Sequence, residues 1–118
     1  MHQISNLTVQ MLHRHAILAQ KHGVSVISLG KTLKSREKFL EEGQFIEECG
    51  ERIQQYAQEL MIYVQLMQLE KFRTTVIYGS AVQVHTEATK IHHQATLVYL
   101  QILKGKLEIV KKCLANET

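Results

Sequence analysis

The chain has no proline, no tryptophan and no aspartate among its 118 residues. Proline interrupts a helix because it removes a backbone hydrogen bond and collides with the preceding turn, so its absence permits long helices. Glutamate is the only acid, which agrees with helix preference and carries no chemistry by itself. Long uninterrupted helices are therefore the first expectation.

Cysteine is also scarce. Cys49 and Cys113 are the only two, and they show no CxxC or other metal-binding spacing. Both lie among apolar residues with helical spacing, so we expect buried free thiols. A disulfide between two helices is the alternative.

Long hydrophobic runs are missing. A membrane span needs roughly 18 to 20 apolar residues, and the longest candidate, 97–103, is interrupted by Gln101. Residues 1–6 lack the charged start and continuous apolar stretch of a secretory signal. We therefore expect no transmembrane segment and a cytoplasmic protein. A nuclear location and weak peripheral membrane contact are the alternatives.

The charge excess is small. Fourteen lysines and arginines face 11 acids, for a formal net charge of +3. The two signs are interspersed over most of the chain, whereas DNA-binding domains concentrate basic residues on one face. The composition therefore gives no strong signal for nucleic-acid binding. One basic cluster is balanced by nearby glutamates and is expected to be a solvated face: Lys31, Lys34, Arg36 and Lys38.

The chain does contain a periodic pattern of apolar residues, spaced alternately three and four positions apart. Such a row forms one face of a helix. Two rows predict helices from about Gly43 to Phe72 and from about Thr75 to Leu114, and the short link between them favours antiparallel packing. The rows are Ile46, Cys49, Ile53, Tyr56, Leu60, Tyr63, Met67 and Ile77, Ala81, Val84, Ala88, Ile91, Ala95, Val98, Ile102.

An earlier helix is predicted to start after Ser5 or Asn6, either of which can cap it. It runs to about residue 41 or breaks at His22–Gly23, and Gly43 is the best-marked break in the chain. Its expected apolar side is Ile4, Leu7, Met11, Leu18, Val26, Leu29, Leu33 and Leu40.

Two segments, 24–29 and 74–78, are rich in β-branched residues, so strands are the competing prediction there. Helix is preferred because the heptad phase at Ile77 continues into Ala81 and Val84. The patterns together predict an all-α fold, an antiparallel bundle of three or four long helices with coiled-coil-like packing. We expect a single domain over 1–118.

The C-terminal segment carries a second apolar row, offset by about 200° from the first and so nearly opposite to it. A helix in a small bundle needs one apolar face, so the second row needs another surface. A second copy of the chain or another helical protein would supply that surface. In the structural interpretation, the surface is the interior of the same bundle. The predicted partner-binding residues are Leu100, Leu103, Leu107, Val110 and Leu114.

Seven histidines are more than expected. His15 and His22 are seven residues apart, as are His85 and His92, so each pair lies on one helix face. The alternative function is a small-molecule or metal-binding bundle, with an enzyme as one form of it, in which His85, His92 and a histidine of the first helix line a cavity. Seven residues rise about 10.5 Å, too far for one pair to hold one ion. We therefore expect no metal and no cofactor, and polar positions at helix interfaces.

Catalytic motifs are absent. Gly30-Lys31-Thr32 does not complete a phosphate loop because Ser25 stands where the earlier glycine is required, and no serine nucleophile elbow occurs. No motif matches a known family residue by residue. The sequence therefore predicts a non-enzymatic helical interaction or assembly module, of the adaptor or scaffold type, without catalytic residues.

Overall fold

The computed structural model describes residues 4–116 as three long helices linked by two 3₁₀ turns. No strand occurs in this range, so the all-α prediction is confirmed and the strand alternative at 24–29 and 74–78 is wrong. Residues 1–3, part of the segment in which no secretory signal is expected, and 117–118 lie outside the described residues. The elements are α1 (Asn6–Lys34), η1 (Glu37–Phe39), α2 (Leu40–Met67), η2 (Glu70–Phe72) and α3 (Thr75–Asn116).

Helix α1 begins as the sequence predicts. The Ser5 side chain accepts a hydrogen bond from the backbone N–H of Thr8 at 3.1 Å and so satisfies one unpaired amide of the first turn. The helix passes through Gly23 without a break. It ends at Lys34, earlier than residue 41, because Arg36 is extended, with φ of −104° and ψ of 120°.

The prediction that Gly43 marks a break is wrong. Helix α2 already begins at Leu40 and contains Gly43, and it ends at Met67 rather than at Phe72. All six glycines of the chain lie inside helices. Four of them serve close packing between helices rather than chain reversal.

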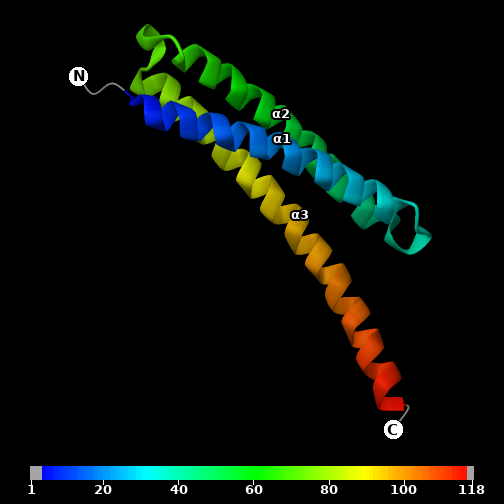
Figure 1. Cartoon of the computed structure of the whole chain (residues 1–118). Helices are drawn as coiled ribbons and strands as arrows, with labels where there is room; N and C mark the ends of the chain where they lie inside the picture. The colour runs from blue at the N-terminus through cyan, green and yellow to red at the C-terminus, as the bar shows by residue number, and fades with distance from the viewer. Residues whose placement is uncertain (1–3, 117–118) are drawn as a thin grey trace.

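Helix α2 turns back alongside α1 (Figure 1). Glycines form the closest contacts between the two helices. A Cβ added at Gly23 would lie 3.1 Å from the carbonyl oxygen of Gly50, and one added at Gly43 would lie 2.8 Å from that of Gly30. The two backbones approach so closely that only glycine fits at these layers. On each helix the small residues recur every seventh position: Ala16, Gly23, Gly30 and Gly43, Gly50, Ala57.

The core lies around α2. The largest fully buried side chains all belong to it: Ile46, Ile53, Leu60, Val64 and Met67. The row predicted for α3 packs on them as expected, with Ala81, Ala88, Ile91, Ala95 and Ile102 buried.

The apolar side predicted for the first half of α1 is wrong, because Leu7, Met11 and Leu18 are exposed. The buried row of α1 keeps the same steps of three and four but is built largely from small side chains. It comprises Val9, Leu12, Ala16, Ala19, Gly23, Val26, Gly30 and Leu33.

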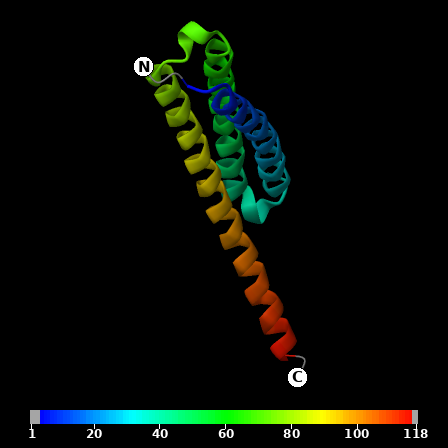
Figure 2. The same ribbon diagram turned by 60° about the vertical axis from the view of Figure 1, so that its left-hand side comes forward.

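The molecule is elongated, 70 by 26 by 17 Å. Its length comes from α3, which starts beside the other two helices and then continues alone beyond the α1–α2 turn (Figures 1 and 2). Within residues 4–116, no helix combines the length and the hydropathy needed to cross a bilayer.

Candidate interaction site

The last part of α3 extends beyond the α1–α2 pair, whose connecting turn it approaches near Lys106. We call Leu103–Asn116 the tail, and every residue in it is exposed. At 1.5 Å per residue it forms about 21 Å of exposed helix. The described residues contain no other helical stretch of this length that is exposed on all sides.

The predicted partner-binding residues lie on this exposed helix and on the turn before it. We call them the leucine row: Leu100, Leu103, Leu107, Val110 and Leu114. Their exposed fractions lie between 40% and 60%, so they do not contribute to the core of this chain. The first apolar row is core as far as Ile102 and then also becomes exposed at Ile109. Soluble monomers rarely leave such a continuous apolar surface uncovered.

The leucine row continues the side of α3 that contacts α1. Leu103 and Val110 follow His85 and His92 by 18 residues, which is five complete helical turns. Both histidines contact α1. The same side of α3 is therefore polar where α1 covers it and apolar where α1 has ended.

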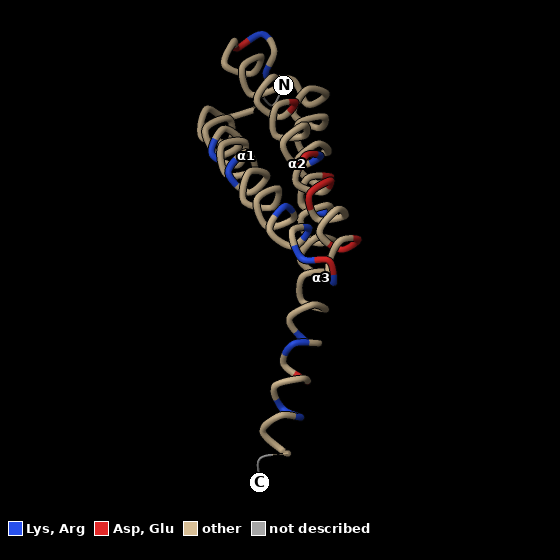
Figure 3. The backbone as a smooth tube through the Cα atoms, turned by 90° about the vertical axis from the view of Figure 1, so that its right-hand side faces the viewer, with Lys and Arg blue, Asp and Glu red and all other residues tan. Residues whose placement is uncertain are grey.

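The tail is also basic, as the blue segments of Figure 3 show. It holds four lysines and one acid, Glu108. The ammonium group of Lys106 lies 5.5 Å from the ring centre of Phe39, a cation–π contact that fixes the beginning of the tail against the α1–α2 turn.

The histidine pairs expected from their spacing do meet across α1 and α3. The rings of His15 and His85 lie 4.7 Å apart between centres, and those of His22 and His92 lie 5.0 Å apart and nearly parallel, at 13°. They line a cavity of about 190 Å³, to which α2 contributes Ile53. We call this cavity the histidine groove.

The groove favours neutral imidazoles. Burial lowers the pKa of His85 below its ordinary value of 6.5, and the positive charge of His15 lowers that pKa further. Burial and then His22 lower the pKa of His92 in the same way. Nδ1 of His85 is buried and makes no hydrogen bond with any described residue.

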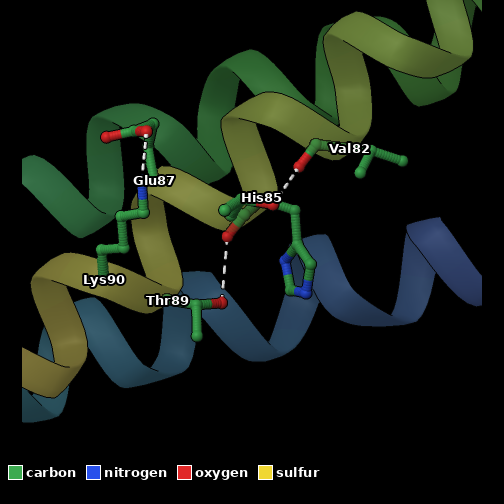
Figure 4. A network of polar contacts seen from close by, with 6 residues as sticks. Val82, His85, Glu87, Thr89 and Lys90 are labelled. Atoms are coloured by element: carbon green, nitrogen blue, oxygen red, sulfur yellow. Dashed lines mark hydrogen bonds and ion pairs between the residues drawn. The ribbon is translucent and has the colours of Figure 1, made fainter.

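The other polar groups near His85 are already satisfied (Figure 4). The hydroxyl of Thr89 donates to the carbonyl oxygen of His85 at 3.0 Å, one turn earlier on the same helix. Glu87 and Lys90 form an exposed ion pair of 3.4 Å on the outside of α3. The histidines are therefore the groups of this site with hydrogen-bonding capacity left for a ligand.

The groove does not assemble a complete metal site. Within residues 4–116, no group of three or more His, Cys, Asp or Glu side chains is placed to hold an ion. Each pair offers two imidazoles, whereas protein zinc sites use three or four ligands.

In comparisons with known proteins, no family model, no curated protein and no solved structure matches the chain. Its class is therefore defined by the molecule itself, an all-α protein with a closely packed helix pair and a third helix that extends beyond it.

The cysteines divide in outcome. Cys49 is buried as expected, and burial raises the pKa of its thiol, an effect that Arg52 opposes and Glu48 reinforces. Cys113 is exposed, so the expectation of burial is wrong there. It lies on the part of α3 beyond Ile102, where no other helix covers the apolar row. Both thiols are free, and the alternative of an interhelical disulfide is not realised.

Proposed function

We propose that the protein is a non-enzymatic helical assembly module, an adaptor or scaffold that joins a second copy or another helical protein through the leucine row. The observation that supports it is the exposed leucine row on a free stretch of helix. The heptad spacing of the row is that of a coiled-coil seam. An antiparallel bundle with coiled-coil-like packing would then form the body that presents the tail.

Burial of this surface supplies the driving force. At about 25 cal/mol per Å², an interface of about 600 Å² of apolar surface gains on the order of 15 kcal/mol before the costs of association. The tail has no such gain within its own chain, because its residues are exposed. Association therefore stabilises the module without altering its core.

The test replaces Leu103 and Leu107 by glutamate. We expect the Leu103→Glu, Leu107→Glu chain to keep its helix content by circular dichroism and its melting temperature, because both side chains lie outside the core. Association is measured by light scattering over a concentration series and by binding of a labelled helical peptide, and we expect the variant to lose it.

A matched control carries the same two added charges on the opposite side of the tail, as Gly105→Glu with Asn116→Glu. At 100° per residue these positions lie roughly 180° from the middle of the leucine row, and a Cβ at Gly105 meets nothing within 4 Å. The control is expected to associate like the original chain. Unfolding of the leucine variant, or association that it leaves unchanged, would contradict the proposal.

A second candidate function is ligand binding in the histidine groove, and the ring pairs across α1 and α3 favour it. Each pair offers two imidazoles, a ligand type that suits zinc and copper, so water or a bound ligand would have to complete the coordination. Titration with zinc sulfate tests it: a rise in melting temperature that His85→Ala removes would support it. No change in melting temperature would remove this candidate.

A further inference from the structure

The net charge of the chain is concentrated in the tail. The tail holds four lysines and one glutamate, whereas residues 1–102 hold ten basic and nine acidic side chains. The body therefore carries a formal charge of only +1 over 102 residues, whereas the 14 residues of the tail carry +3. Such a concentration selects partners by the sign of their charge.

The lysines also stand at informative positions of the heptad. With Leu100, Leu107 and Leu114 at position a, Leu103 and Val110 fall at position d. The flanking e positions are then Lys104 and Lys111, and Lys106 is at g. Residues at e and g set partner choice in coiled coils, and the tail has no acid at either.

This pattern disfavours a second copy of the chain. In a parallel pair Lys106 would face Lys111 of the second copy, since g and e positions meet there. In an antiparallel pair, where e positions meet, Lys104 would face Lys111 of the second copy. Either arrangement places like charges beside the apolar seam, which weakens pairing. A partner helix with glutamates at its own e and g positions would instead form ion pairs.

The shape of the row favours a helix over a lipid surface. At 100° per residue, the leucine row covers an arc of about 80° on the helix, the narrow stripe of a coiled-coil seam rather than a broad membrane-binding face. The tail also lacks the tryptophan and phenylalanine typical of interfacial helices.

The fold adds a position for the partner. His15 faces His85 and His22 faces His92, so α1 and α3 keep a register offset of 70 residues over this heptad. Extended to the end of α1, the same offset would bring Lys34 level with Lys104 along the helix axis. A partner helix on the leucine row would lie on the side of α3 that α1 occupies, beyond its last turn.

We infer that the tail binds an acidic amphipathic helix of another protein, with apolar residues in a heptad row and glutamates beside it. This inference rests on the proposed function and specifies its partner. Leucine contacts would supply the burial, and Lys104, Lys106 and Lys111 would select the charge.

The experiment uses the full chain and two synthetic 21-residue peptides, roughly three heptads long, with leucine at a and d. One peptide has glutamate at e and g, and its twin has lysine. We expect the glutamate peptide to bind roughly tenfold or more tightly than the lysine peptide, by fluorescence anisotropy, with a difference that shrinks as salt is added. The charge-reversed chain, Lys104→Glu with Lys111→Glu, is expected to prefer the lysine peptide.

The possible failures separate this inference from the proposed function. Equal binding of both peptides, or a dimer of the chain that Leu103→Glu with Leu107→Glu dissociates, overturns the acidic partner and leaves the assembly function standing. Tighter binding to phosphatidylcholine–phosphatidylserine vesicles than to the glutamate peptide overturns it in favour of a membrane. If the chain stays monomeric and binds neither peptide nor vesicles, both the inference and the proposed function fall.

Discussion

Helix α1 contacts its two neighbours in opposite ways. Against α2 it presents Gly23 and Gly30, so the backbones nearly touch at these layers and leave no space there for a further atom. Against α3 it presents His15 and His22, whose rings hold the helices apart around a cavity. The first contact is therefore limited by steric exclusion and the second by solvation and charge, and the two respond to different perturbations.

The largest expected effect is steric. Gly30→Ala would place a Cβ against the backbone of Glu47, which cannot move without shifting α2. We expect a loss of about 1 to 3 kcal/mol in the free energy of unfolding, the cost of overpacking, although alanine is the better helix former. Urea denaturation followed by circular dichroism measures it.

The matched controls are two glycines on α3. A Cβ at Gly79 or at Gly105 meets nothing within 4 Å, so only helix propensity changes there. Gly79→Ala and Gly105→Ala are expected to raise the free energy of unfolding by up to about 1 kcal/mol. A stabilised Gly30→Ala chain would mean that α1 and α2 are not in backbone contact.

The next effect concerns the ion pair at the end of the same interface. Lys34 on α1 donates to Glu47 on α2 at 2.8 Å, and the Glu47 side chain is only 11% exposed. Lys34→Ala would leave this carboxylate without its partner, at an expected cost of about 1 to 3 kcal/mol. Equilibrium unfolding gives the value. In the exposed pair on α3, Glu87→Gln serves as control and is expected to cost at most about 0.5 kcal/mol.

The smallest effect belongs to the histidine groove and depends on pH. The pKa values of His85 and His92 are lowered in the folded protein, so below pH 6.5 the unfolded chain takes up protons that the folded chain excludes. The free energy of unfolding is therefore highest above pH 6.5, where both states hold neutral imidazoles. It decreases as the pH falls below 6.5 toward the lower pKa values of the folded state. Protonation would also set like charges against each other in each ring pair, while the groove's α2 residue, Ile53, is uncharged.

Thermal melting at about pH 7.5 and at about pH 5.5 measures this dependence. A chain with His85→Gln and His92→Gln is expected to lose part of it, whereas His13→Gln, outside the two ring pairs, keeps it. A higher melting temperature of the original chain at the lower pH would show that the groove stabilises charged imidazoles.

Much of the fold follows from local pattern. The rows through Ile53 and through Ile91 face the core as predicted, because apolar side chains at steps of three and four form one face that must be covered. Once the structure brings His15 to His85, the seven-residue spacing on both helices also brings His22 to His92. A heptad repeat on two packed helices returns to the same side at each layer.

The errors have one physical source. Gly43 was predicted to be a break and Leu7, Met11 and Leu18 to be buried, because a hydrophobicity pattern gives weight to large side chains. The detectable signal was the seven-residue recurrence of small residues on both helices. This recurrence marks an interface in which two helix backbones come close together because the residues between them have no large side chain.

By itself the sequence determined the helical class, the two large apolar rows and the leucine row, since these depend on periodicity along one chain. Only the tertiary structure decided which rows are covered. Helix α3 is longer than the pair on which it packs, so Ile102 is core while Ile109 and the leucine row are exposed. Burial of a row depends on where the neighbouring helices end. The positions of those ends relative to α3 are a property of the assembled fold rather than of any one segment.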